Sequence, residues 1–507
     1  MSVTATNPIL PGFYPDPSIC AVGDDFYLVN STFAYFPGIP IMHSKDLAHW
    51  EQIGNACDRE SQLPLGDTGH SRGLFAPTIR YHEGTFYIIC TNVSYGGNFI
   101  ITAQNPAGPW SEPHYIEGAD GIDPSLFFDE DGTCYYIGTH PNPAGYQYDG
   151  DWYIWIQELD IENMKLVGEV HNVWNGAMRN IIWPEGPHLY KIGEYYYIMH
   201  AEGGTGPDHA VTVCRSKNVY GPYENNFCNP ILTHRHLGRK YPIRYVGHAD
   251  LVKTINDEWY MVMLAVRPLE GYTTMGRETF LARVEWENDW PVVNPGVGRL
   301  TDTVEINLPK WTTYTAESNE YVFSTMGQLP PEFMVLRNAD KSHYSLEKGK
   351  GLLMLFDTHT LKEQASPSYL AFRQKHHHFI AKALLDVSNL SEDKRAGIAY
   401  VQNNLYNLRV EVNGKMAEVI LCEKGTDRRV ISMPLQGSNP LEVSLEVDGL
   451  SAAVIIEGQK SPEVDIRTLS TEAAGGFTGC TVGLYAVADT ENTDCACFKR
   501  FSYSEAL

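Results

Sequence analysis

The chain has 507 residues, of which 43% are hydrophobic and 12% aromatic, with 44 Gly and 30 Pro. That length exceeds a single ordinary core, and the abundance of aromatic, Gly and Pro residues favours an all-β protein of two domains with many turns. The formal net charge of −24 repels phosphate backbones and anionic lipid, so we expect neither nucleic acid nor a membrane among its partners. A small neutral substrate is compatible with that charge.

The first residues, 1–11, contain no basic cluster and no apolar run of signal-peptide length. No apolar run in the chain is long enough to span a bilayer. The ten cysteines are scattered, without the paired spacing of a zinc site. We therefore expect a cytoplasmic protein with reduced thiols.

Five stretches within residues 1–300 follow one plan: an apolar strand, a tight turn at Gly or Asp, and a strand rich in aromatic residues. The tyrosines that end the plan are 60, 48, 61 and 64 positions apart. A period of this length built from strands and turns is typical of β-propeller blades, so we predict a five-bladed β-propeller over residues 1–300. The residues that head the five repeats are Asp16, Ala76, Asp123, Glu185 and His248.

The pattern changes after the segment 290–298, which is rich in Pro, Gly and Val. From residue 315 to residue 507, short strand candidates are separated by polar turns. Examples are Gly351–Phe356, Leu408–Val412 and Val443–Val447. This arrangement predicts a second domain, 315–507, folded as a β-sandwich of jelly-roll type.

Three of the five repeats begin with a carboxylate: Asp16, Asp123 and Glu185. The first strand of each blade faces the central channel, so these side chains are expected to converge on one axis. Three like charges in one place repel each other and are costly to desolvate, which a structural role does not explain. The competing interpretation is turn capping, since Asp before Pro is a common turn opener.

Hydrolysis of a glycosidic bond needs an acid on the leaving oxygen and a base or nucleophile on the other face of the sugar. Asp123 and Glu185 head neighbouring blades, and a neighbouring carboxylate raises the pKa of the second one. We therefore predict Glu185 as the general acid, Asp16 as the base, and Asp123 as the group that tunes and orients Glu185.

His248 heads the fifth repeat and is expected to face the same channel. It is predicted as a metal ligand, with calcium as the preferred ion, whose other ligands would have to be water or carboxylate oxygens. The alternative is a hydrogen-bonded packing histidine without a metal.

Several ordered motifs resemble glycoside hydrolase family 43, in its exo-acting β-xylosidase and α-L-arabinofuranosidase branch. The resemblance spans essentially the whole chain. The matching segments are Asn7–Ser18, Ala76–Tyr81, Gly121–Leu126, Glu185–Leu189, Ala201–Thr205, Gly247–Asp250, Gly276–Thr279 and Gly475–Gly479.

The resemblance implies a five-bladed propeller followed by a sandwich, and inverting hydrolysis that requires no cofactor. It assigns the base to Asp16, the pKa modulator to Asp123 and the acid to Glu185. In an inverting enzyme the two reacting carboxyl groups lie about 6.5–9.5 Å apart, which leaves space for a water molecule.

The resemblance also implies a set of substrate-binding residues. Arg277 is similar to a residue that binds sugar hydroxyls, and Phe33 to an apolar wall of the terminal-sugar pocket. Phe477 is similar to a side chain that the sandwich contributes to the pocket rim. Phe75 stands where many xylosidases of this branch have Trp, and it joins the same set. An aromatic wall suits the C–H face of a sugar.

Phe75 and the short insertion Pro268–Met275 resemble the arabinofuranosidase side of the branch. We therefore predict release of α-L-arabinofuranose, with β-D-xylose as a further product, from arabinoxylan-derived or related plant oligosaccharides. Three alternatives stay open: a mainly β-1,4-xylosidase acting on xylo-oligosaccharides, a non-catalytic carbohydrate-binding propeller, and a retaining enzyme acting on fructosides. A homo-oligomer formed through the sandwich also stays open.

Overall fold

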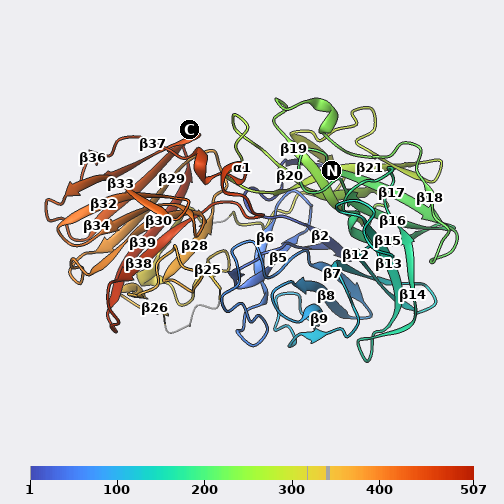
Figure 1. The fold of residues 1–507 in the computed structure, drawn as a ribbon, viewed down its shortest axis with the longest axis horizontal. Coiled ribbons are helices and arrows are strands. Elements are labelled where there is room, and N and C mark those ends of the chain that lie inside the picture. The colour runs from blue at the N-terminus through green and yellow to red at the C-terminus, as the bar shows by residue number, and fades with distance from the viewer. Residues whose placement is uncertain (1, 317, 338–342, 507) are drawn as a thin grey trace.

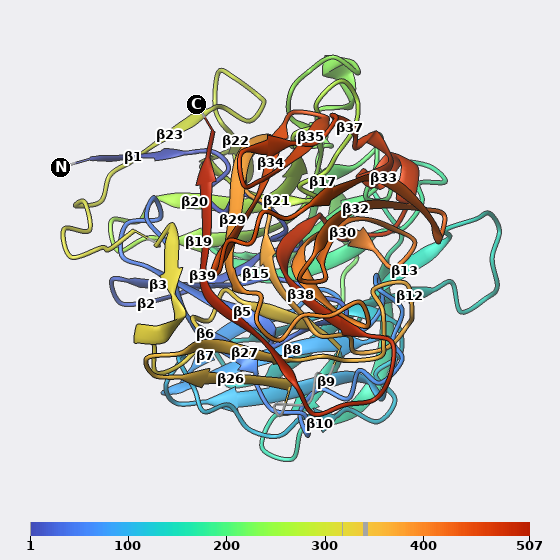
Figure 2. The same ribbon diagram turned by 90° about the vertical axis from the view of Figure 1, so that its left-hand side faces the viewer.

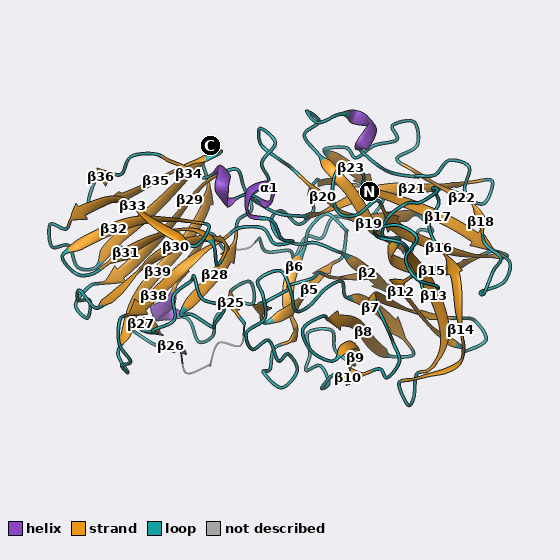
Figure 3. Ribbon diagram, viewed as in Figure 1, coloured by secondary structure: helices purple, strands orange, loops and turns teal. Residues whose placement is uncertain are grey.

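A computed structural model describes residues 2–316, 318–337 and 343–506. Its strands form two bodies that lie side by side (Figure 1), and the described residues contain little helix (Figure 3). The expected fold class is confirmed: a five-bladed β-propeller is followed by a β-sandwich. The short helical segments include η1 (Arg235–Leu237), η2 (Phe323–Thr325), η4 (Arg467–Leu469) and α1 (Thr471–Ala474). None of the helices within the described ranges is long and apolar enough to cross a membrane.

Each blade is a four-stranded antiparallel sheet whose first strand lies nearest the centre of the ring. Blade 1 contains β2 (Ser18–Val22), β3 (Asp25–Val29), β5 (Gly38–Ser44) and β6 (Glu51–Cys57). Blade 2 contains β7 (Thr78–His82), β8 (Thr85–Asn92), β9 (Gly97–Ala103) and β10 (His114–Tyr115). Blade 3 contains β11 (Ile122–Phe128), β12 (Cys134–Pro141), β13 (Trp152–Asp160) and β14 (Lys165–Trp174). Blade 4 contains β15 (Glu185–Ile192), β16 (Tyr195–Glu202), β17 (Ala210–Ser216) and β18 (Glu224–Asn225). Blade 5 contains β19 (Arg244–Lys253), β20 (Trp259–Val266), β21 (Glu278–Glu287) and β22 (Trp290–Val293).

The blades pack face to face, which explains why their central strands are apolar on both sides. One buried cluster joins blades 2 and 3 and includes Ile89 and Trp155. The next joins blades 3 and 4 through Ile137 and Ile198. Each blade therefore buries its two faces against its neighbours.

The ring is closed by the segment that precedes blade 1. Leu10 and Thr279 of β21 exchange two backbone hydrogen bonds of 3.2 Å, which joins this segment to blade 5. Outside the blades, β1 (Val3–Thr6) pairs with β23 (Thr303–Ile306), which follows the last blade strand. The two ends of the propeller sequence are thereby held together.

The sandwich consists of a nine-stranded sheet and an eight-stranded sheet. The nine-stranded sheet contains β24 (Glu320–Val322), β26 (Tyr344–Glu347), β27 (Gly351–Leu355), β29 (His378–Asp386), β34 (Leu441–Asp448), β35 (Ser451–Ile456), β36 (Gln459–Lys460), β37 (Val464–Asp465) and β39 (Cys495–Glu505). The eight-stranded sheet contains β4 (Tyr35–Phe36), β25 (Met334–Leu336), β28 (Tyr369–Arg373), β30 (Lys394–Asn403), β31 (Tyr406–Val412), β32 (Met416–Glu423), β33 (Thr426–Pro434) and β38 (Thr481–Ala488). Strand β29 alternates between buried and half-buried residues, as expected for a strand with one face on the core.

One strand of the sandwich belongs to the propeller part of the sequence. β4 lies in the loop between β3 and β5 of blade 1, and it pairs with β25 through Phe36 and Val335. The buried Arg337 adds a backbone hydrogen bond of 2.7 Å from its N–H to the carbonyl of Ala34. Figure 2, viewed from the sandwich side, shows β29, β30 and β38 in front of the propeller. The two domains therefore share a sheet.

Candidate active site

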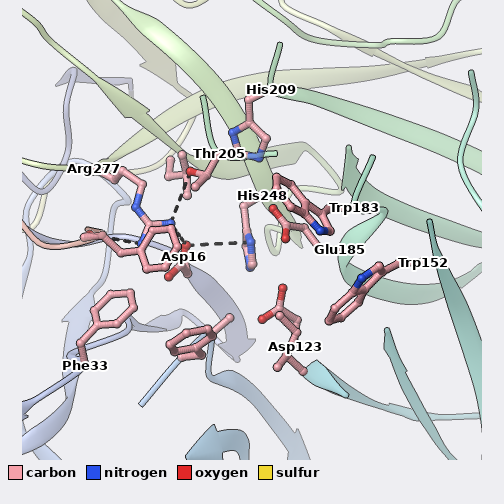
Figure 4. A pocket seen from close by; sticks show the side chains of 15 residues that line it. Asp16, Phe33, Asp123, Trp152, Trp183, Glu185, Thr205, His209, His248 and Arg277 are labelled. Atoms are coloured by element: carbon pink, nitrogen blue, oxygen red, sulfur yellow. Dashed lines mark hydrogen bonds and ion pairs between the residues drawn. The ribbon is translucent and has the colours of Figure 1, made fainter. Parts of the chain in front are cut away.

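A cavity of about 210 Å³ lies at the centre of the propeller, where the inner strands begin. Its walls come from all five blades, and one side chain comes from the sandwich (Figure 4). The lining residues are Asp16, Phe33, Phe75, Ala76, Ile122, Asp123, Trp152, Trp183, Glu185, Thr205, His209, His248, Leu264, Arg277 and Phe477. The eight residues predicted for the site all lie in this set.

Local backbone geometry turns the head residues toward the axis. Asp16, Asp123 and His248 have φ angles of 52°, 53° and 50°, in the left-handed region that side chains other than Gly seldom adopt. The pairing of β11, β15 and β19 with the second strand of each blade shifts register next to Asp123, Glu185 and His248. Such bulges re-aim a side chain, and they are common next to active sites. Ala76, which heads the second repeat, has only a methyl group, which is too small to fill the centre.

Asp16 is held by two short hydrogen bonds. Ser31 Oγ donates to its Oδ2 at 2.6 Å, and Arg277 Nη1 donates to its Oδ1 at 2.7 Å. His248 Nδ1 lies 3.9 Å from the same Oδ1. These contacts fix the orientation of the carboxyl group, as a base that must meet one water molecule requires.

Asp123 and Glu185 share a different environment. The backbone N–H of Gly186 donates to Asp123 Oδ2 at 3.1 Å, which ties the heads of blades 3 and 4 together. Burial raises the pKa of Asp123 to about 6, against the opposing effect of His248. Burial raises the pKa of Glu185 well above its usual range, and the negative charges of Asp123 and Asp16 raise it further. Glu185 is therefore the carboxyl group best suited to carry a proton near neutral pH.

Three phenylalanines form a wall on the opposite side of the cavity. The ring centroids of Phe33 and Phe75 are 5.4 Å apart, and that of Phe477 lies 6.0 Å from Phe33 and 6.1 Å from Phe75. The Arg277 guanidinium carbon lies 5.7 Å from the Phe33 centroid and 5.5 Å from the Phe477 centroid. Arg277 also donates to the carbonyl oxygen of Phe477 at 3.3 Å, so the guanidinium connects the base to the wall.

Several lining residues were not predicted. Trp152 and Trp183 lie beside Asp123 and Glu185 (Figure 4). Trp152 belongs to the acidic and aromatic segment 149–155, which from the sequence predicts only a blade strand. Strand β13 does begin at Trp152, but the side chain of this residue lines the cavity. Thr205 is the last residue of the motif Ala201–Thr205, so the family resemblance could have indicated that it lines the cavity. Ile122 lies in the motif Gly121–Leu126, next to Asp123, whereas Leu264 lies in an apolar strand without any distinguishing pattern.

His209 is a further lining residue that the sequence did not single out. Its Nδ1 contacts the carbonyl oxygen of Tyr245 at 2.9 Å, and its buried Nε2 has no hydrogen-bond partner among the described residues. Burial lowers the pKa of His209 to about 3, so the ring is neutral. Because Nδ1 donates its proton to a carbonyl oxygen, Nε2 is a hydrogen-bond acceptor. An imidazole nitrogen at the cavity wall can bind a sugar hydroxyl.

His248 packs against the head of blade 4. Gly186 has a φ of 57°, and a Cβ at this position would lie 2.8 Å from the His248 ring, so only Gly fits. Within the residues that the structure describes, no group of three or more His, Cys, Asp or Glu side chains is placed to hold a metal ion. The predicted metal role of His248 thus lacks a protein ligand set.

The sequence and the fold match known proteins over nearly the whole chain. The profile of Glycosyl hydrolases family 43 matches residues 5–291, and that of the beta xylosidase C-terminal Concanavalin A-like domain matches residues 321–504. The chain is 51% identical to a xylosidase/arabinosidase of Butyrivibrio fibrisolvens, over 98% of both chains. It is 38% identical to a non-reducing end alpha-L-arabinofuranosidase of Bacteroides ovatus, over 99% of this chain and 94% of the relative. A solved xylan beta-1,4-xylosidase from Bacillus halodurans superposes with a TM-score of 0.91 at 33% identity, over 99% of this chain and 100% of that chain.

A propeller of this kind, with a carboxylate-lined central cavity and a sandwich that completes its wall, defines a glycosidase. The chain belongs to glycosyl hydrolase family 43. The resemblance inferred from the sequence motifs is confirmed.

Proposed function

We propose that the protein is an inverting, exo-acting glycosidase that releases terminal α-L-arabinofuranose, and β-D-xylose more slowly, from plant oligosaccharides. The observation that carries the proposal is the small cavity whose lining includes three carboxyl groups and a wall of three phenylalanines. A small cavity with one apolar end accepts the tip of a sugar chain and leaves no passage for the chain to run through.

The three carboxyl groups have separate roles in the proposed mechanism. Asp16, oriented by Ser31 and Arg277, takes a proton from a water molecule that attacks the anomeric carbon. Glu185 gives its proton to the leaving oxygen on the opposite face of the sugar. Burial keeps Glu185 protonated, and the negative charge of Asp123 adds to this effect. Arg277 and the phenylalanine wall position the sugar ring.

A time course with proton NMR tests the reaction. The purified protein should hydrolyse nitrophenyl α-L-arabinofuranoside, and the first sugar seen should have the inverted anomeric configuration. A retained anomer would support the retaining mechanism and contradict this proposal. A lack of turnover on all nitrophenyl pentosides would support the non-catalytic binding propeller.

A mainly β-1,4-xylosidase activity is the second candidate. It is favoured by the likeness to the Bacillus halodurans xylan beta-1,4-xylosidase, whereas Phe75 in place of Trp favours the arabinofuranosidase. A side-by-side assay on nitrophenyl α-L-arabinofuranoside and nitrophenyl β-xylopyranoside decides between them. A large excess of kcat/KM on the xyloside would overturn our preference.

We further propose that no cofactor takes part in the chemistry, since proton transfer between carboxyl groups and water accounts for each step. A structural calcium ion beside His248 stays a prediction, and water would have to supply most of its ligands. Activity and melting temperature measured with and without a chelator test it. The predicted cytoplasmic location and assembly through the sandwich also stay proposals.

A further inference from the structure

A second, polar cleft of about 360 Å³ lies outward from the catalytic cavity at the junction of blades 3 and 4. Two loops form it: residues 142–151 between β12 and β13, and residues 175–184 between β14 and β15. Because neighbouring blade strands are antiparallel, both loops lie at the end of the ring where Asp123 and Glu185 begin the inner strands. The cleft and the cavity therefore open on the same face.

Two tryptophans of the cavity lie next in sequence to residues of the cleft or are bonded to its loops. Trp152 and Trp183 line the catalytic cavity, whereas Asp151 and Tyr153, the sequence neighbours of Trp152, line the cleft. The backbone N–H of Trp183 donates to the carbonyl oxygen of Gly150 at 2.8 Å, which joins the two loops. In Figure 4, both tryptophans lie on the Glu185 side of the cavity, away from Phe33. They therefore mark the edge of the cavity that is next to the two loops of the cleft.

The position of the acid gives the direction of the leaving group. Glu185 has to contact the oxygen of the bond that breaks, so the part of the substrate beyond this oxygen leaves the cavity on the Glu185 side. The phenylalanine wall of Phe33, Phe75 and Phe477 closes the other side. A leaving group longer than one sugar therefore passes Trp152 and Trp183 and reaches the cleft.

The cleft carries groups that bind sugar rings. Its lining includes the aromatic rings of Tyr148 and Tyr153, the amide of Asn175 and the guanidinium of Arg179. Rings stack on the C–H face of a sugar, and amide and guanidinium groups bind hydroxyls. Arg179 is exposed and makes no hydrogen bond or ion pair with other residues of the described ranges, so its donors are available to a ligand.

Hydrogen bonds within and between the two loops fix the shape of the cleft. Asp151 is 2% exposed, and its Oδ2 accepts hydrogen bonds from Asn142 Nδ2 at 2.8 Å and from the backbone N–H of Gln147 at 3.0 Å. Asn175 Nδ2 donates to the hydroxyl of Tyr153 at 3.4 Å, which joins the second loop to the start of β13. These bonds hold the lining residues in place before a ligand arrives, which lowers the entropic cost of binding.

We propose that this cleft binds a sugar unit of the leaving group beyond the unit next to the scissile bond, so that oligosaccharides are the preferred substrates. The inference rests on the proposed function, because it takes its direction from Glu185 as the acid. The preferred substrate is then a chain of at least three sugars, with the terminal pentose in the cavity and a neutral polyhydroxylated unit in the cleft.

Steady-state kinetics on two kinds of substrate test the cleft. The first is nitrophenyl α-L-arabinofuranoside, whose leaving group is too short to reach it. The second is a series of arabinofuranosyl xylo-oligosaccharides with one, two and three xylose units in the leaving group. In the wild type, KM should fall when the leaving group grows from one unit to two. Arg179→Ala and Tyr148→Ala should each raise KM on the longer substrates about five- to ten-fold and leave kcat/KM on the nitrophenyl substrate within about two-fold.

Tyr146→Ala is the matched control, because Tyr146 lies on the same loop, is 61% exposed and does not line the cleft. It should leave all substrates unaffected. A KM that does not depend on leaving-group length, or equal effects of Arg179→Ala on both kinds of substrate, would overturn the cleft alone. Absence of turnover on every pentoside would instead overturn the proposed function and, with it, the cleft.

Discussion

At the scale of single residues, the carboxyl groups of the site lie in two contrasting environments. Asp16 accepts hydrogen bonds from Ser31 and Arg277, so it is surrounded by donors that suit a charged oxygen. Glu185 has two carboxylates nearby and is shielded by the cavity walls, so its neutral form is favoured. The environment, and not the residue type, therefore divides the work between a base and an acid.

Replacing the acid should separate substrates by leaving group. Glu185→Gln keeps the shape of the side chain and removes its proton, so we expect kcat/KM on an oligosaccharide to fall about 10²–10⁴-fold. The loss should be much smaller on a dinitrophenyl pentoside, whose leaving oxygen needs no proton. Glu194→Gln, in an exposed position at the turn of the same hairpin, is the control. Equal losses on both substrates would remove Glu185 from the role of acid.

The pH profile should report the charge of Asp123. The acid works when it is protonated, so activity is lost as pH rises through the raised pKa of Glu185. Asp123→Asn removes one of the negative charges that raise this pKa, so it should lower the pKa and move the alkaline limb of kcat/KM to lower pH, by about one unit. Asp120→Asn, in an exposed position shortly before it, should leave the limb in place. A limb that moves to higher pH would contradict the assignment.

At the scale of elements, the inner strands are joined below the cavity by one buried polar network. Asp250 of β19 accepts hydrogen bonds from Ser18 Oγ at 2.7 Å, Arg80 Nη1 at 2.9 Å and the hydroxyl of Tyr190 at 2.6 Å. Arg80 also reaches His188 Nδ1 at 2.9 Å. A further contact of 3.1 Å joins this nitrogen to Ser125 of blade 3, so all five blades take part.

The network should be essential for stability. Asp250→Asn leaves the Arg80 guanidinium buried without its counter-charge, so we expect the free energy of unfolding to fall by about 3–5 kcal/mol. Denaturant titration of the purified variant measures this change. Asp257→Asn changes an exposed carboxylate on the same blade, and its effect should be within about 0.5 kcal/mol of zero. A stable Asp250→Asn variant would show that the blades need no common polar centre.

The sequence predicts the elements unevenly, for physical reasons. The repeat locates the inner strands, because the turn, the apolar run and the aromatic strand are all local patterns; β15 begins at its head residue Glu185, and β2 begins two residues after Asp16. The hydrogen bond between Ser18 and Asp250 joins residues 232 positions apart, so no local pattern indicates it. The sequence places Trp152 in a strand but not in the cavity. Alternation of apolar and polar residues indicates which face of a strand is buried, but it does not indicate what the first residue of the strand contacts.

At the scale of the whole molecule, the active site depends on the second domain. Phe477 reaches the cavity from the segment before β38, and its side chain is 40% exposed. Nothing in the sequence of the propeller indicates that the phenylalanine wall of its cavity needs a residue from the second domain. The family resemblance alone suggested this contribution of the sandwich, and the ring distances to Phe33 and Phe75 now describe it.

Removing this ring should weaken substrate binding without unfolding the protein. Phe477→Ala deletes about one third of the apolar wall, so KM for nitrophenyl α-L-arabinofuranoside should rise about five- to ten-fold. The melting temperature should stay unchanged because the side chain is not part of a core. Leu405→Ala, a 45% exposed position of the sandwich away from the cavity, is the control. An unchanged KM would mean that the propeller binds the pentose alone.

The strand β4 has a consequence for how such a protein can change over evolutionary time. It carries the loop of Phe33 into the neighbouring sheet, where Phe36 pairs with Val335. A truncation or gene fusion that replaced the sandwich would leave this loop without its partner and would release a wall of the pentose site. We therefore expect the propeller and the sandwich to be inherited as a pair, and a change in sugar preference to arise by substitutions in both domains and not by exchange of one of them.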